Sequence, residues 1–236
     1  MSLILAFDTS TKGCSAALFD QEYCIAHKQI IEDGFVHAEQ LHLLIESLFE
    51  HTLYDFSTID AFAVGAGPGS YTGLRIGISA AKGYAFALER PLIAIDSLEL
   101  LAESIFFQIK DLELEEALIF SAIDARRQEV YARIQSVQGQ LIIPSQLLLL
   151  EEFNAQATLS AYKTIYVIGD ASEKLNLFFA DYIESYDFRF IQTFPNALHM
   201  GGIALNRFRS RDFVSTEYFE PNYLKEVHIT PPKAEQ

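Results

Sequence analysis

Residues 64–88 read Val-Gly-Ala-Gly-Pro-Gly-Ser-Tyr-Thr-Gly-Leu-Arg-Ile-Gly-Ile-Ser-Ala-Ala-Lys-Gly-Tyr-Ala-Phe-Ala-Leu. A largely apolar run over residues 59–64 leads into glycines at 65, 67 and 69, and the residues after Ser70 have helical spacing with no further proline. The stretch therefore predicts a strand, a glycine-rich turn and a helix.

Glycine-rich turns of this kind often bind phosphate, because their backbone N–H groups can point at an anion at a helix N-terminus. This turn lacks the Gly-Lys-Ser or Gly-Lys-Thr of a P-loop. The dinucleotide-binding fingerprint would require glycine where Ser70 or Thr72 stands. Phosphate binding therefore stays an alternative that neither fingerprint supports.

The helix carries small or apolar residues on most of its surface. One stripe at helical spacing is apolar, and a second, about a quarter turn away, contains Gly73, Gly77, Ala80 and Tyr84. Interior glycines cost a helix roughly 1 kcal/mol each against alanine unless another backbone approaches closely. We expect one face to meet a sheet and the other to meet a second helix, in this chain or in a partner subunit.

The composition describes a globular and strongly acidic chain. Half of its 236 residues are hydrophobic, and its formal net charge is −15. No apolar run reaches the length of a membrane span, and the first residues lack the basic segment of a signal peptide, so we expect a cytoplasmic protein that does not contact the membrane. So acidic a chain should bind nucleic acid poorly by itself. Cys14 and Cys24 lie in apolar runs and are predicted to be buried and reduced.

The same order of elements occurs twice. The first unit consists of three strand-like runs joined by tight turns, then alternating helices and strands up to about residue 110. A second buried run begins at residue 117 and ends at Asp124, as the first ends at Asp8. His37 and His42 are five residues apart, which places them on different faces of a helix, so this pair does not predict a metal site.

This repetition predicts an α/β fold of two actin-like (ASKHA, ribonuclease H-like) lobes, of which the second is reduced. We assign residues 1–110 to the N-terminal lobe and residues 111–236 to the C-terminal lobe, with the tail packing back on the first lobe. In this architecture an aspartate that ends the first strand of each lobe faces a nucleotide, and Asp8, Thr9 and Ser10 fit its first phosphate loop. The second unit has no Gly-Gly run placed to hold an adenosine, so we do not expect this chain alone to hydrolyse nucleotides.

Five segments together resemble the TsaB (YeaZ) family, the dimerisation subunits of the bacterial machinery that makes threonylcarbamoyladenosine at position 37 of tRNA. They are Ile-Leu-Ala-Phe-Asp-Thr-Ser at 4–10, His-Ala-Glu-Gln-Leu at 37–41, Gly-Ala-Gly-Pro-Gly-Ser-Tyr-Thr-Gly-Leu-Arg-Ile-Gly at 65–77, Asp-Ala-Arg-Arg-Gln-Glu-Val-Tyr at 124–131 and Pro-Asn-Tyr-Leu-Lys at 221–225. The resemblance spans nearly the whole chain, and residues 65–77 are its most specific part.

The resemblance implies a catalytic paralogue, TsaD, in which one helix begins with two metal-binding histidines four residues apart. Ser97 and Leu101 stand at the matching positions here, and leucine cannot ligate a metal. No catalytic residue and no metal ligand are therefore expected. This departure argues against the older description of such proteins as metal-dependent glycoproteases.

The implied role is a non-catalytic subunit that binds and activates TsaD and offers a docking site for the ATPase TsaE. The predicted interface with TsaD, or with a second copy in a homodimer, consists of His37, Leu41, Gly73, Gly77, Ala80 and Tyr84. Transfer RNA would be held only through the complex. No resident cofactor is expected, although the interface with TsaD leaves a place for ATP or ADP.

Asp8, Thr9, Ser10, Gly67, Gly69 and Ser70 are then vestiges of a nucleotide cleft. Two other readings stay open. An ATP-dependent small-molecule kinase of the actin-like class would bind ATP in that cleft, and a metal-dependent glycoprotease would hold a metal.

Overall fold

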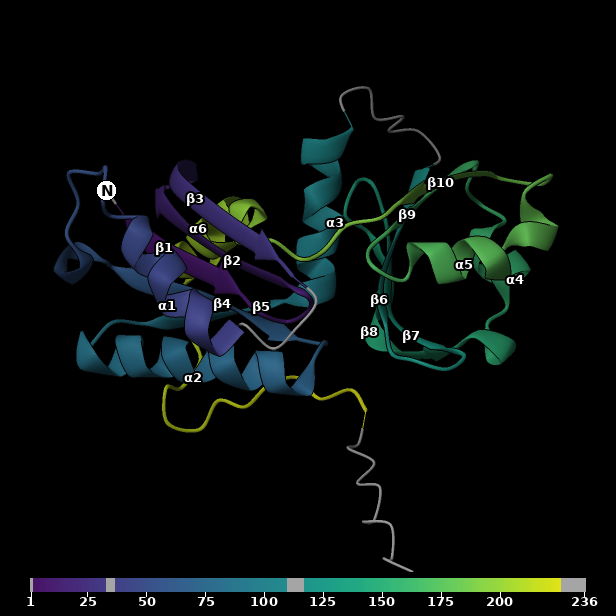
Figure 1. Cartoon of the computed structure of the whole chain (residues 1–236). Helices are drawn as coiled ribbons and strands as arrows, with labels where there is room; N and C mark the ends of the chain where they lie inside the picture. The colour runs from purple at the N-terminus through teal and green to yellow at the C-terminus, as the bar shows by residue number, and fades with distance from the viewer. Residues whose placement is uncertain (1, 33–36, 110–116, 226–236) are drawn as a thin grey trace, which may run out of the picture.

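The computed structural model describes residues 2–32, 37–109 and 117–225. Two five-stranded sheets stand side by side, with helices packed around each (Figure 1). The strands of the first sheet are β1 (Leu3–Asp8), β2 (Gly13–Asp20), β3 (Tyr23–Ile31), β4 (Ala61–Gly67) and β5 (Leu92–Asp96). Those of the second are β6 (Ala117–Asp124), β7 (Glu129–Ser136), β8 (Leu141–Leu149), β9 (Thr164–Ile168) and β10 (Asp187–Ile191).

The two sheets have the same topology. The first has the strand order β3-β2-β1-β4-β5, and the second has the order β8-β7-β6-β9-β10. In each sheet the central strand pairs antiparallel with the next strand in sequence and parallel with the strand that follows the meander. The duplication confirms the predicted two-lobed actin-like α/β fold.

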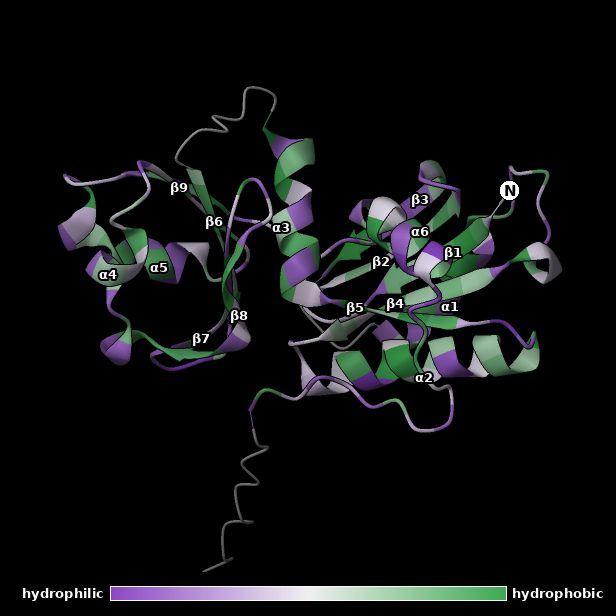
Figure 2. Ribbon diagram, turned by 180° about the vertical axis from the view of Figure 1, so that it is seen from behind, coloured by the Kyte–Doolittle hydropathy of each residue, from purple (hydrophilic) through white to green (hydrophobic). Residues whose placement is uncertain are grey.

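Helices cover both faces of the first sheet. On one face α1 (His37–Ser47) and α2 (Tyr71–Ala87) pack together on an apolar cluster that contains Leu5, Phe62 and Leu74. Ser70 caps α2, since its side chain accepts a hydrogen bond from the backbone N–H of Gly73. Apolar residues follow the strands and recur along α2 (Figure 2).

Helix α3 (Ser97–Gln108) lies between the lobes (Figure 1). Asp96 caps it by accepting hydrogen bonds from the backbone N–H groups of Leu98 and Glu99. Its side chains Leu98, Leu101, Ala102 and Ile105 join an apolar cluster built mainly from the second sheet. Helix α3 therefore packs the two lobes together.

The second lobe has shorter helices than the first. They are α4 (Ala155–Leu159) and α5 (Ser172–Phe178). The described residues also include the single 3-10 turns η1 (Phe56–Thr58), η2 (Leu150–Glu152), η3 (Ala180–Tyr182) and η4 (Ala197–His199). The core of this lobe is rich in aromatic rings, among them Phe120, Phe153 and Phe179. No helix of the described segments is long and apolar enough to cross a membrane.

The chain returns to the first lobe after β10. Helix α6 (Gly201–Ser210) and η4 pack on the first sheet, where Ala197, Met200, Ala204 and Leu205 meet Ile4 and its neighbours. The boundary at residue 110 stays a prediction, but α6 contributes to the core of the first lobe rather than to that of the second. Of the two cysteines predicted to be buried, Cys14 is buried, whereas Cys24 near the start of the edge strand β3 is exposed, so that prediction is wrong.

Candidate functional site

The strand β1 ends in a loop that lies directly on the glycine-rich turn. Asp8, Thr9 and Ser10 are all at most 1% exposed. The backbone N–H of Ser70 donates to the carbonyl of Ser10 at 2.6 Å, and the Thr9 hydroxyl donates to the carbonyl of Gly73 at 2.7 Å. The loop and the turn are therefore in backbone contact.

Four glycines make this contact possible. A Cβ atom at Gly69 would lie 2.1 Å from the carbonyl oxygen of Ser10, and one at Gly73 would lie 2.0 Å from that of Thr9. At Gly77 a Cβ would meet the Thr9 hydroxyl at 2.3 Å, and at Gly65 it would meet the Asp8 carboxylate at 1.8 Å. Of the remaining members of the predicted cleft, Gly67 has a φ of +96°, in the region that favours glycine, and Ser70 is exposed.

Asp8 is an unusual buried carboxyl group. One of its oxygens accepts hydrogen bonds from the Ser10 backbone N–H at 3.0 Å and from the Ser10 hydroxyl at 2.9 Å. Its other oxygen is buried and has no hydrogen-bond partner among the residues that the structure describes. Burial raises the pKa of Asp8 to about 6, against the hydrogen bonds from Ser10, which lower it.

The residues predicted to form a partner interface fall into two groups. His37, Leu41, Gly73 and Gly77 are buried inside this chain, and the His37 ring Nε2 lies 2.6 Å from the carbonyl oxygen of Thr11. Ala80 and Tyr84 are only partly buried. The small-residue stripe is thus explained by contacts within the chain, and the assignment of these residues to a partner interface stays a prediction.

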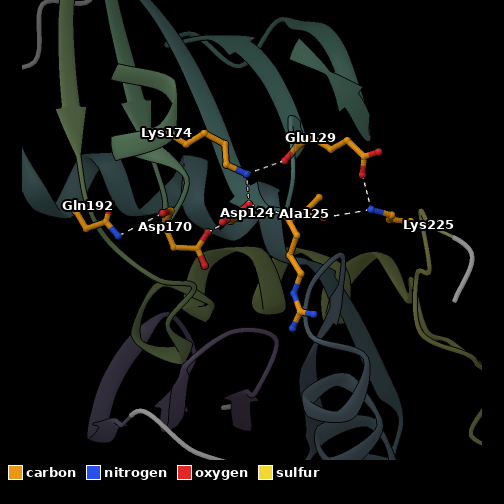
Figure 3. Close-up of polar contacts among 8 residues, drawn as sticks. Asp124, Ala125, Glu129, Asp170, Lys174, Gln192 and Lys225 are labelled. Atoms are coloured by element: carbon orange, nitrogen blue, oxygen red, sulfur yellow. Dashed lines mark hydrogen bonds and ion pairs between the residues drawn. The ribbon is translucent and has the colours of Figure 1, made fainter. Parts of the chain in front are cut away.

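The corresponding strand end in the second lobe is polar and open. Asp124 is exposed and forms an ion pair with Lys174, whose ammonium also donates to the carbonyl of Glu129 at 3.2 Å (Figure 3). The Asp124 backbone N–H donates to the Asp170 carboxylate at 2.8 Å. Burial raises the pKa of Asp170 to about 6. Asp8 and Asp124 therefore hold equivalent positions in very different surroundings.

The C-terminal tail runs along α2. The Lys82 ammonium donates to the carbonyls of Glu217 and Phe219, each at 3.1 Å. The backbone N–H of Asn222 donates to the carbonyl of Ala66 at 2.8 Å, beside the glycine-rich turn. Tyr223 packs on Tyr71, with ring centroids 5.0 Å apart.

The tail then reaches the second lobe. The Lys225 ammonium pairs with the Glu129 carboxylate and donates to the carbonyl of Ala125 at 3.3 Å (Figure 3). Sequence reasoning identified residues 221–225 as a motif but did not predict this contact. The signals that pointed to this region were the equivalence of Asp8 and Asp124 and the two family-like segments at 124–131 and 221–225.

The two helical glycines Gly73 and Gly83 offer a matched pair of substitutions. Gly73→Ala should lower the free energy of unfolding by about 1–3 kcal/mol, because the new methyl group meets backbone. Gly83→Ala, where a Cβ meets nothing within 4 Å, should raise it by about 1 kcal/mol through helix propensity. Urea unfolding of both variants measures this, and equal gains would contradict the contact with Thr9.

The raised pKa of Asp8 predicts a pH-dependent stability. The Asp8 carboxyl group has a pKa of about 6 in the folded state and an ordinary value of 3.8, so its ionisation destabilises the folded state. The free energy of unfolding is therefore free of this penalty below about pH 4 and falls as the pH rises to about 6. Asp8→Asn should therefore be more stable than the wild type at pH 8, by about 2–3 kcal/mol more than at pH 4. Denaturant unfolding at both pH values tests this, with the exposed Asp181→Asn as control; a difference that does not change with pH would refute it.

Lys225→Met keeps the aliphatic stem but removes the charge that links the tail to the second lobe. Hydrogen exchange at residues 219–225 and 125–129 should become faster, while global stability should fall by no more than about 1 kcal/mol. Lys28→Met, an exposed lysine on β3, should leave exchange at these segments unchanged. Unaltered exchange in Lys225→Met would show that the tail does not depend on this link.

Comparisons with known proteins bear on the whole chain. Residues 35–228 match the family model described as TsaD, tRNA N6-adenosine threonylcarbamoyltransferase. The tRNA threonylcarbamoyladenosine biosynthesis protein TsaB of Haemophilus influenzae is 26% identical over 231 residues, which cover 94% of this chain and 93% of that protein. TsaB of Escherichia coli is 34% identical over 128 residues, 54% of this chain and 52% of that protein.

A solved structure agrees with these relatives. YeaZ from Pseudomonas aeruginosa is 28% identical and superposes with a TM-score of 0.73 over 95% of this chain and 100% of that chain. The chain accordingly belongs to the family described as TsaD, tRNA N6-adenosine threonylcarbamoyltransferase, and within it to the TsaB (YeaZ) proteins.

Proposed function

We propose that this chain is a non-catalytic subunit in the synthesis of tRNA N6-threonylcarbamoyladenosine, where it binds and activates a catalytic TsaD paralogue. The names of the TsaB relatives support the pathway, and the description of the matching family model supports the transferase reaction. That this chain is the non-catalytic subunit and the paralogue the catalytic one is argued from the residues of α3 and of the first lobe.

The main support for the proposal is the identity and burial of two residues near the start of α3. Ser97 and Leu101, which stand where the resemblance places the metal-binding histidines of TsaD, are both 0% exposed. Leu101 belongs to the apolar cluster that joins α3 to the second sheet. A leucine in a packed core supplies no metal ligand and leaves no room for one.

The first lobe also disfavours catalysis by this chain alone. A kinase of the actin-like class needs space for phosphate beside Ser10 and Gly69, yet the backbones of these residues are in contact. A metal-dependent peptidase needs a ligand set, and no group of three or more His, Cys, Asp or Glu able to hold a metal occurs within residues 2–32, 37–109 and 117–225. We therefore propose that the isolated chain carries no ATP or ADP.

Helices α1 and α2 supply the surface for the partner. The exposed fraction of Leu43 on α1 is 57%, and that of Phe86 on α2 is 79%. Between the helices opens a hollow of about 500 Å³ lined in part by His42, Phe49 and Tyr84. Neither Leu43 nor Phe86 lines this hollow, but exposed apolar side chains on a helical surface are typical of a protein-binding surface. The same surface would serve a homodimer, and TsaE would dock on the assembled complex.

Leu43→Glu and Phe86→Glu, tested singly, should each weaken association with the TsaD paralogue of the same organism at least tenfold, because a desolvated charge is costly at an interface. Both side chains are exposed, so the fold should persist. Size-exclusion chromatography with light scattering measures association, and a threonylcarbamoyl transfer assay on the mixture measures activation.

Leu177→Glu is the matched control, because Leu177 is 77% exposed but lies on α5 of the second lobe. It should associate and activate like the wild type. Transfer by the paralogue that does not depend on this chain, or association that survives both α1 and α2 variants, would contradict the proposal.

A further inference from the structure

The turn between β6 and β7 holds two arginines in an unfavourable backbone conformation. Arg126 has a φ of 67° and Arg127 a φ of 51°. Residues with a Cβ rarely adopt this left-handed region, and two successive residues do so at a cost that asparagine and glycine largely avoid. Backbone strain that persists in a folded protein is often found at functional sites.

The two guanidinium groups have no counter-charge within the described part of the chain. Both arginines are exposed, and neither guanidinium group forms an ion pair or a hydrogen bond there, although the backbone N–H of Arg126 donates to the Asp124 carboxylate at 2.8 Å. The acidic residues at the two ends of the turn, Asp124 and Glu129, are already paired with Lys174 and Lys225. With Asp170 included, the cluster contains four cations and three carboxyl groups, in a chain whose net charge is −15.

The turn is also held in place from both sides. Lys225 reaches over from the tail to the carbonyl of Ala125 at 3.3 Å, and Lys174 reaches from α5 to the carbonyl of Glu129 at 3.2 Å (Figure 3). These contacts fix the backbone from which Arg126 and Arg127 project. A binding group positioned in this way loses little conformational entropy when its ligand arrives.

We propose that Arg126 and Arg127 contact backbone phosphates of RNA. Guanidinium groups match the geometry of phosphate oxygens, and an exposed turn suits an extended polyanion better than a small nucleotide, which needs a concave site. The inference rests on the proposed function, which places a tRNA beside this chain. It adds to that function a direct RNA contact in a subunit whose overall charge repels RNA.

The test uses the complex of this chain with the TsaD paralogue and a tRNA transcript, titrated by fluorescence anisotropy between 50 and 200 mM KCl. Arg126→Glu/Arg127→Glu should weaken tRNA binding at least tenfold and reduce the slope of log K against log salt by about 2. Arg209→Glu/Arg211→Glu makes the same charge change at two exposed arginines at the end of α6, and it should stay within threefold of the wild type.

A second variant separates the role of the side chains from that of the backbone. Arg126→Asn/Arg127→Gly should relieve the strain and raise the melting temperature, yet weaken tRNA binding. A raised melting temperature with unchanged tRNA binding and salt slope would overturn the proposal. So would loss of association with the paralogue in the glutamate variant, because the turn would then bind an acidic protein surface.

Failure of the proposed function gives a different result. If the wild-type chain and the paralogue do not associate in light scattering, the proposed function is contradicted, and the same titration is made with this chain alone. A smaller salt slope in the glutamate variant, but not in its control, would still support the RNA contact, and equal slopes would overturn it.

Discussion

The close backbone contact between the loop after β1 and the glycines of the β4–α2 segment is the constraint on which the rest of the structure depends. Gly69 and Gly73 lie so near the carbonyls of Ser10 and Thr9 that neither could carry a side chain without movement of the backbone. The contact buries Asp8 and sets the position of α2 on the sheet. Helix α1 and the tail then pack against α2. The position of the proposed partner surface on α1 and α2 therefore depends on this contact.

The same contact makes the two lobes unequal. The first-lobe strand end is closed, and its aspartate is buried with a raised pKa. The second-lobe strand end is open, and its aspartate holds a lysine at the surface. The two lobes share one topology but differ at these strand ends: the first lobe carries the helices that we propose as a partner surface, and the second has charged groups around a short turn. The tail joins them, since it crosses α2 and ends at that turn.

Much of this was predictable from periodicity and caps. The repeated order of strands predicted the duplicated sheets, and Ser70 and Asp96 cap the helices α2 and α3 as residues of their type commonly do. The small-residue stripe of α2 was predicted to meet a second helix, in this chain or in a partner. Its Tyr84 does contact His42 on α1, whereas Gly73 and Gly77 meet the loop residue Thr9. A glycine stripe indicates that a backbone comes close, and it does not say which backbone. The packing of α6 on the first sheet could not be predicted either, because the amphipathic pattern of a helix does not show which sheet the helix covers.

The polar site at the second lobe was the least predictable part. Asp124 was recognisable as the counterpart of Asp8, but Lys174 reaches it from 50 residues away in sequence, and Lys225 reaches the nearby Glu129 from 96 residues away. The positive φ values at Arg126 and Arg127 oppose local preference, and no sequence pattern indicates such strain. The proposed RNA contact depends on contacts between residues far apart in sequence and on an unfavourable local backbone conformation, and neither produces a periodic sequence pattern.

The central claim is that the first lobe binds no nucleotide, because the backbones of Ser10 and Gly69 are in contact where a phosphate would need space. Isothermal titration calorimetry of Mg-ATP into the chain alone tests it most directly, at protein concentrations that would reveal a micromolar site. The account predicts no saturable heat. A micromolar affinity, abolished by closing the same space further with Gly69→Ala, would contradict it and would restore an ATP-dependent activity to this chain.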